Sequence, residues 1–189
     1  HAYVPLSYIN STTISQSITE ANVHNGKYTV DSFGTLGSIG DVFVDNLEHV
    51  YLADTTNNRI VALDDNYNLR LIISSFINEN GVPDALSKPQ GVFVTENEIY
   101  VADTGKSRIV IFDKMGNFQC IVSEPASEVI PDKSVYTPIA VSVDKAGRIY
   151  VISSTTNYGV ISMNRDGSFN GFVGAQKVTY GIFQYIWRM

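Results

Sequence analysis

Residues 89–113 read PQGVFVTENEIYVADTGKSRIVIFD, and this stretch decides the fold class of the chain. Short runs rich in Val, Ile, Tyr and Phe alternate with polar turns, a pattern typical of β-strands and hairpins rather than of helices. With the turn at Lys114–Gly116, the pattern predicts four strands, near 91–95, 98–102, 107–113 and 117–122. We interpret them as one antiparallel meander.

The same pattern occurs three times along the chain. Tyr51, Tyr100 and Tyr150 mark equivalent positions, spaced 49 and 50 residues apart. A four-stranded unit of this length cannot bury both of its faces alone, so it must stack on its neighbours, and radial stacking gives a β-propeller. The expected four-stranded blades cover about residues 34–75, 86–125 and 136–173.

A known repeat family shares this motif. The pattern Pro-x-Gly-Val-x-Val, followed by Ile-Tyr-Val-Ala-Asp-Thr-Gly-x-x-Arg-Ile-x-x-Phe-Asp, runs from Pro89 to Asp113 and resembles the NHL repeat. The resemblance covers about residues 34–173, although Ser153 and Gly159 replace the Asp and Arg in the third unit. NHL repeats usually close as six-bladed propellers, which implies an all-β, incomplete β-propeller of NHL-like four-stranded blades for this chain.

Both ends of the chain depart from the repeat pattern. Residues 1–26 are expected to form an irregular arm, and the strand-like residues 27–33 would begin the propeller region at 27–173. Apolar residues recur at helical spacing in 174–189, which predicts a short amphipathic C-terminal helix. Three blades are too few to close a ring, so the chain is either a fragment of a longer protein or an open arc that pairs with another chain.

Composition excludes several classes of partner and cofactor. The net charge of −6 and the scattered basic residues argue against nucleic acid, and no apolar run approaches the ~18–20 residues of a membrane span. The single cysteine, Cys120, rules out an intrachain disulfide, and the three histidines lack metal-ligand spacing. We therefore expect no metal and no cofactor. The His1–Ala2 start and the scarcity of cysteine favour an extracellular or cell-surface location.

Two groups of polar residues recur in the loops between the second and third strands. Asp54 with Arg59, and Asp103 with Arg108, are expected to be structural pairs, because a carboxylate and a guanidinium can fix such a loop through charge-assisted hydrogen bonds. The neighbouring loop positions vary between units, and variable loops on a rigid scaffold are where a ligand would bind. The candidate ligand-binding residues are Thr55, Asn57, Asn58, Thr104, Lys106, Thr155 and Asn157.

These observations predict a non-catalytic interaction scaffold that binds protein or carbohydrate through loops at one end of the propeller, and that is not an enzyme. Two alternatives remain open. In the first, the chain is a calcium-dependent, lactonase-like hydrolase in which Asp41, Asp45 or Asp144 helps to hold the ion. In the second, it is an assembly module that completes a ring with a second chain, such as a homo-oligomer joined through open propeller edges.

Overall fold

The fold consists of three similar antiparallel sheets arranged side by side. The computed structural model describes residues 35–125, 136–155 and 159–174. Blade 1 comprises β1 (Ile39–Val44), β2 (Val50–Asp54), β3 (Arg59–Leu63) and β4 (Leu69–Ile73); blade 2 comprises β7 (Pro89–Val94), β8 (Glu98–Asp103), β9 (Arg108–Asp113) and β10 (Phe118–Val122); blade 3 comprises β11 (Pro138–Val143), β12 (Ile149–Ser153), β13 (Val160–Met163) and β14 (Phe169–Val173). Each blade is a meander in sequence order, which confirms the predicted fold class.

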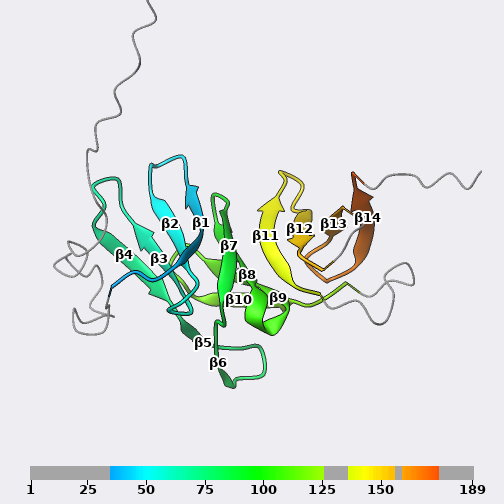
Figure 1. The fold of residues 1–189 in the computed structure, drawn as a ribbon, viewed down its shortest axis with the longest axis horizontal. Helices are drawn as coiled ribbons and strands as arrows, with labels where there is room; N and C mark the ends of the chain where they lie inside the picture. The colour runs from blue at the N-terminus through cyan, green and yellow to red at the C-terminus, as the bar shows by residue number, and fades with distance from the viewer. Residues whose placement is uncertain (1–34, 126–135, 156–158, 175–189) are drawn as a thin grey trace, which may run out of the picture.

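The blades stand in an arc that does not close into a ring (Figure 1). The first strands of the blades, β1, β7 and β11, are neighbours along the inner side of this arc. Each first strand also carries an irregularity at the same place, where the register against the second strand shifts at Ile39/Asp41, Pro89/Gly91 and Pro138/Ala140. The described residues thus form three blades of an incomplete propeller.

Apolar side chains on facing sheets hold the blades together. Between blades 1 and 2, residues such as Tyr51, Ile60 and Phe112 form one buried cluster. Between blades 2 and 3, residues such as Ile109, Ile149 and Met163 form a second cluster, with Cys120 partly buried against it. A third cluster lies on the far face of blade 1, where Leu36 packs against Leu52, Val61 and their neighbours. Successive side chains of a strand point to opposite faces of its sheet, so every second residue enters one of these clusters. This arrangement explains the alternating apolar pattern of the sequence.

The structure also contains a small two-stranded sheet that the repeat pattern does not predict. Strands β5 (Ser75–Ile77) and β6 (Pro83–Ala85) pair in the segment that links blades 1 and 2 and project below these blades in Figure 1. A short 3₁₀ helix, η2 (Thr104–Lys106), lies between β8 and β9. The described part of the chain has no helix with the length and hydrophobicity to span a bilayer. The arm at 1–26, the strand at 27–33 and the helix expected from 174 onward fall outside the described residues, apart from Gly174.

Gly91 sits where the backbones of blades 2 and 3 approach each other closely. A Cβ atom added at this position would lie 2.9 Å from both Ala140 Cα and Ile139 O, which belong to β11. Backbone atoms cannot move aside as a flexible side chain can, so a side chain at this position would force the two inner strands apart.

We therefore expect Gly91→Ala to destabilise the chain by about 1–3 kcal/mol, the usual cost of overpacking a filled site. The measurement is urea unfolding followed by circular dichroism, with Ser142→Ala, an exposed position on β11, as the control. A Gly91→Ala midpoint equal to that of the wild type would contradict the close approach of the strands.

Candidate functional site

A hollow of about 920 Å³ opens at one end of the blades, where turns join the first and second strands of each blade. The turns of all three blades contribute to it, and the ends of the inner strands form its floor. Phe43 and Phe93 lie there edge to face, with their ring centroids 4.9 Å apart. The lining residues are Phe43, Asp45, Asn46, Leu47, Phe93, Val94, Thr95, Glu96, Asn97, Tyr100, Lys114, Val143, Asp144, Lys145 and Gly147.

Asp45 is a heavily bonded carboxylate in the hollow. Its Oδ2 accepts hydrogen bonds from Lys114 Nζ at 2.8 Å and from the Tyr51 hydroxyl at 3.2 Å, and the ring of His49 lies at 3.2 Å. Its Oδ1 accepts the backbone N–H groups of Leu47 and His49. Lys114 comes from the turn between β9 and β10, so the contact joins blade 2 to blade 1.

These partners determine the protonation state of Asp45. Burial by itself would raise the pKa of this carboxyl, but the hydrogen bonds from Lys114 and from the backbone of His49 and Leu47 lower the pKa well below its ordinary range. Asp45 is therefore a permanent carboxylate near neutral pH and has no proton to donate in general acid catalysis.

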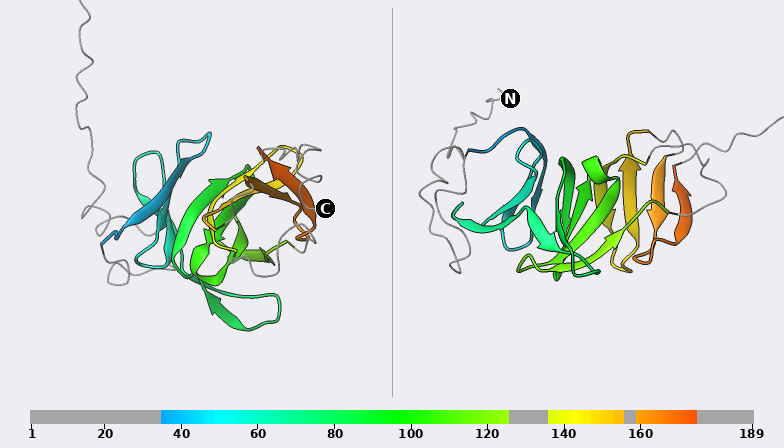
Figure 2. Two further views of the ribbon diagram at one scale, coloured as in Figure 1. Left: turned by 45° about the vertical axis from the view of Figure 1, so that its right-hand side comes forward. Right: turned by 90° about the horizontal axis from the view of Figure 1, so that it is seen from below.

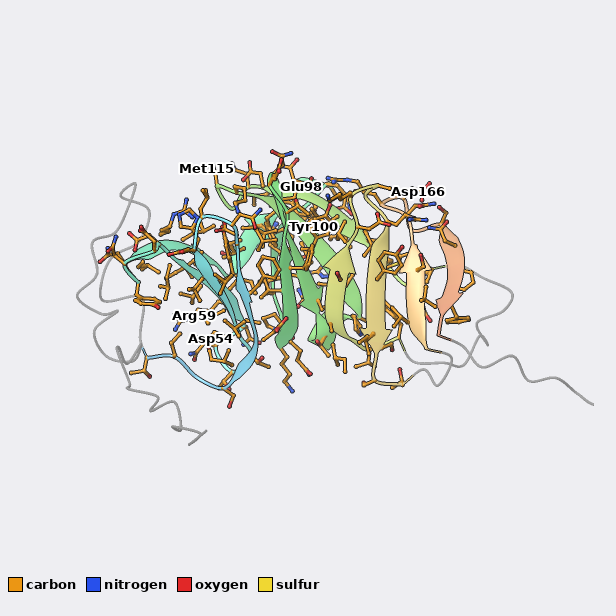
Figure 3. The ribbon with its side chains drawn as sticks, turned by 90° about the horizontal axis from the view of Figure 1, so that it is seen from above. Asp54, Arg59, Glu98, Tyr100, Met115 and Asp166 are labelled. Atoms are coloured by element: carbon orange, nitrogen blue, oxygen red, sulfur yellow. The ribbon has the colours of Figure 1, made fainter. Side chains whose placement is uncertain are left out.

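A similar contact joins blade 3 to blade 2. Glu98, at the start of β8, accepts the hydroxyl of Tyr100 at 2.7 Å and two hydrogen bonds from Arg165 Nη1, at 2.6 and 2.8 Å. Arg165 belongs to the turn between β13 and β14. Figure 3 shows Glu98, Tyr100, Met115 and Asp166 together at this end of the arc, and Asp54 and Arg59 at the other.

In blade 3 the corresponding carboxylate has partners within its own blade. Asp144 Oδ2 accepts Arg148 Nε at 2.7 Å and the Tyr150 hydroxyl at 3.1 Å. Its Oδ1 accepts the backbone N–H groups of Ala146 and Arg148. The carboxylates of the three blades therefore have fixed positions and bonded oxygens.

At the opposite end of the arc, buried carboxylates tie each incoming segment to its blade. Asp54 Oδ1 accepts the N–H of Gly37 at 3.0 Å, while its Oδ2 accepts Arg59 Nε at 2.8 Å. Asp103 repeats the arrangement with Ser87 N–H at 2.6 Å and Arg108 Nε at 2.7 Å. Both aspartates are fully buried. The expected structural pairs thus form ion pairs that also fix the chain entering each blade.

Asp84 on β6 adds a second carboxylate to the pair in blade 2. It accepts Arg108 Nη1 at 2.7 Å and Lys106 Nζ at 2.5 Å, and Phe76 of β5 lies beneath the Arg108 guanidinium at 5.6 Å. The hydrogen bonds from Arg108 lower the pKa of the Asp84 carboxyl well below its ordinary range. The β5–β6 hairpin is therefore fastened to blade 2 by charge, although no local sequence signal pairs Asp84 with Arg108, 24 residues away.

Comparison with known proteins agrees with this architecture. The family model described as "NHL repeat" matches residues 86–112, which span most of the first three strands of blade 2. The chain contains an NHL repeat. No curated protein matches the sequence significantly.

Several solved structures have a fold similar to that of this chain. A streptogramin B lyase matches with a TM-score of 0.53 and 14% identity, covering 76% of this chain and 42% of that one. A gluconolactonase from Xanthomonas campestris matches with a TM-score of 0.53 and 18% identity, covering 75% of this chain and 48% of that one. Hydrazine synthase from Kuenenia stuttgartiensis matches with a TM-score of 0.52 and 8% identity, covering 89% of this chain and 40% of that one. At these identities the likeness concerns the fold alone. The chain spans less than half the length of each of these proteins.

The loop residues predicted from the sequence lie at the end of the blades opposite the hollow, and the described ones make bonds within the chain. The Thr55 hydroxyl donates to Pro89 O and the Thr104 hydroxyl to Pro138 O, each at 2.6 Å. The remaining described candidates also have partners: Asn57 bonds Asp54 and Thr35 O, Asn58 accepts Lys88 N–H, Lys106 bonds Asp84, and Thr155 bonds Ser153. Asn157 lies outside the described residues. A ligand-binding role for these residues stays a prediction.

The three aspartates considered for calcium are held by different partners. Asp41 accepts its neighbour Val42 N–H and, at 3.0 Å across the blade boundary, Val92 N–H. Asp45 bonds Lys114, and Asp144 bonds Arg148. Among the described residues, no group of three His, Cys, Asp or Glu side chains is placed to hold a metal ion.

The low pKa of Asp45 yields a test of its pairing with Lys114. In wild-type protein the Asp45 carboxyl should stay ionised below the ordinary aspartate pKa of about 3.9, and in Lys114→Met it should titrate closer to that value. A lowered native pKa stabilises the fold at pH values above the unfolded-state pKa, and this contribution is lost as pH falls through the native pKa. Lys114→Met should therefore lose less stability than the wild type on acidification below about pH 4.

Carboxyl-carbon NMR titration of Asp45 measures its pKa. Urea unfolding between neutral pH and a pH of about 3 measures how the free energy of unfolding depends on pH. Met115→Ala, next to Lys114 on the exposed turn, is the matched control. An unchanged Asp45 titration in Lys114→Met would show that the ammonium does not set this pKa.

Proposed function

We propose that the chain is a non-catalytic binding scaffold whose ligand occupies the hollow at the turns between first and second strands. The observation that carries this proposal is the hollow itself, which collects turns from three rigid blades around an aromatic floor. Its volume of about 920 Å³ lies within the usual ~300–1,000 Å³ of small-molecule sites. A rigid scaffold also limits the ordering cost of binding.

The lining favours carbohydrate over a protein surface as the ligand class. Phe43 and Phe93 offer apolar contact, whereas Asn46, Asn97 and Thr95 offer amide and hydroxyl groups at the rim. The carboxylates of Asp45 and Asp144 are paired with cations, and Glu96 and Lys145, the two other charged residues of the lining besides Lys114, carry opposite charges, so the formal charges of the hollow largely balance. A neutral, hydroxyl-rich ligand of a few sugar units suits this combination of size and polarity. A location outside the cell, expected from the sequence, remains part of the proposal.

The bonding of the carboxylates supports a non-catalytic role. A calcium ion at Asp45 would meet the Lys114 ammonium 2.8 Å from the same oxygen, and one at Asp144 would meet the Arg148 guanidinium at 2.7 Å. Like charges at this distance oppose binding of the ion. The enzymes among the structural neighbours share the fold with this chain, and these ion pairs favour a scaffold over the hydrolase alternative.

Carbohydrate binding is tested by screening the full chain on a glycan array and titrating the best oligosaccharide by calorimetry. Asn97→Ala removes an exposed amide from the rim and should weaken binding about fivefold, the equivalent of one hydrogen bond of about 1 kcal/mol. Asn80→Ala changes the same residue type on the exposed β5–β6 turn and should leave affinity unchanged. No bound glycan, or equal affinities for both variants, would contradict the proposal.

Calcium provides the contrasting test of the hydrolase alternative. An ion that binds only the folded state raises the apparent Tm by mass action. We expect no change in Tm when millimolar calcium replaces a chelator, because cations already occupy the carboxylates. A Tm increase that disappears in Asp144→Asn would instead support an ion site in the hollow.

A further inference from the structure

The contacts between blades at the hollow end follow one repeated arrangement, which we call the clasp. Each clasp consists of a carboxylate and a tyrosine hydroxyl on one blade and a basic side chain from the next. Asp45, Tyr51 and Lys114 form the clasp between blades 1 and 2. Glu98, Tyr100 and Arg165 form the clasp between blades 2 and 3.

The basic residues of the two clasps occupy equivalent positions. Lys114 directly follows Asp113, whose backbone N–H donates to Asn117 O and closes the turn between the third and fourth strands. Arg165 directly follows Asn164, whose N–H donates to Ser168 O in the same way. Each following blade thus uses the second residue of the same turn to reach the blade before it.

Blade 3 carries the carboxylate and the tyrosine of a third clasp. Tyr150 donates its hydroxyl to Asp144 Oδ2 at 3.1 Å, as Tyr51 does to Asp45. In blade 1, Asp45 contacts both a base of its own turn, His49, and the base from the next blade, Lys114. Asp144 contacts the base of its own turn, Arg148, and the described residues supply no cation from a following blade.

The same side of blade 3 exposes apolar residues that are buried in the other blades. Ile152 is 46% exposed and Val173 is 52% exposed. Strand pairing places them where blade 2 has Ala102 and Val122, which are 0% and 1% exposed because blade 3 covers them. Blade 3 therefore has, beside its half-formed clasp, the kind of apolar surface that blade 2 uses to pack against blade 3.

Blade 1 of a second copy does not fit this surface. Its third turn begins at Asp64, whose N–H donates to Asn68 O, so Asp65 occupies the place of Lys114 and Arg165. Stacking blade 1 of one copy on blade 3 of another would bring the carboxylate of Asp65 to that of Asp144. The clasp position would then hold a second carboxylate in place of a cation, and like charges brought together at an interface oppose association.

We propose that the outer face of blade 3 docks a further propeller blade that presents Lys or Arg at the turn between its third and fourth strands. The cation completes a clasp with Asp144 and Tyr150, while the blade covers Ile152 and Val173. The proposal goes beyond the ligand site, and it rejects closure of a six-bladed ring by two copies of this chain, because Asp65 places the wrong charge in the clasp.

The test converts blade 1 into the required partner. Asp65 is exposed, so Asp65→Lys supplies a cation at the clasp position without a buried change. We expect the wild-type chain to stay at its monomer mass of 20.8 kDa in sedimentation equilibrium and light scattering. Asp65→Lys should self-associate at least about tenfold more tightly than Asp65→Asn, since close charge pairs at interfaces couple by ~1.5 kcal/mol or more.

Two controls separate the clasp from general charge effects. Asp65→Asn removes the negative charge without adding a cation, so it should associate no more than weakly. The second control combines Asp65→Lys with Asp144→Asn. The asparagine keeps an amide oxygen for the hydrogen bonds of the turn but lacks the charge of the carboxylate, so this double variant should be a monomer. Circular dichroism confirms that each variant is folded.

The outcomes decide between the two assemblies. Association that requires both the Asp65→Lys substitution and an intact Asp144 carboxylate, and that weakens with added salt, supports the clasp. Wild-type dimers as tight as those of Asp65→Lys would overturn the proposal, because the native blade 1 would then fit. Equal masses for Asp65→Lys and Asp65→Asn would also overturn it, because the cation would have no effect.

Discussion

The buried side chain at the end of each second strand is the constraint on which the blades depend. Asp54 and Asp103 each accept the backbone N–H of the segment that enters the blade and, with the other oxygen, an arginine from the third strand. Ser153 keeps the first of these bonds in blade 3, where its hydroxyl accepts Thr137 N–H at 2.9 Å. Because a buried carboxylate is tolerated only when it is paired and hydrogen-bonded, three chain segments must meet at this point. The first strand then has a fixed starting place against the second.

The two ends of the propeller use their polar groups differently. At the end with Asp54 and Arg59, the Thr55 and Thr104 hydroxyls and the Asn58 amide oxygen bond backbone atoms of the segment that enters the next blade, so they hold neighbouring blades in place. Figure 2 shows the blades standing side by side in two further views. At the other end, ion pairs cross the blade boundaries beneath the turns, while Asn97 and Lys145 remain exposed on the turns themselves. Fixing the blades at one end and leaving polar side chains exposed at the other suits a scaffold that presents a binding surface.

The sequence predicts the fold well because its evidence is local. Alternating apolar residues, the turn at Lys114–Gly116 and the recurrence of Tyr51 in each unit identify the strands and their period. The β5–β6 hairpin has only three-residue strands and no equivalent in the other repeats, so periodicity does not reveal it. The hollow and the clasp depend on pairs 67 and 69 residues apart, such as Arg165 with Glu98 and Lys114 with Asp45. Such pairs form only when the blades stack, and the local pattern of apolar and polar residues does not show which residues will then meet.

The first turn of blade 2 is one residue shorter than the other two, and its carboxylate comes from a different position. Thr95 stands where blades 1 and 3 have Asp45 and Asp144, while Glu98 stands where they have the bases His49 and Arg148. The longer glutamate side chain still places its oxygens beside the tyrosine hydroxyl. A column-by-column comparison of the repeats would therefore report a lost acid and a reversed charge, although the interaction is kept in space. To compare such repeats, the chemical groups that occupy the same place in space are therefore a better guide than the residues at the same position of an alignment.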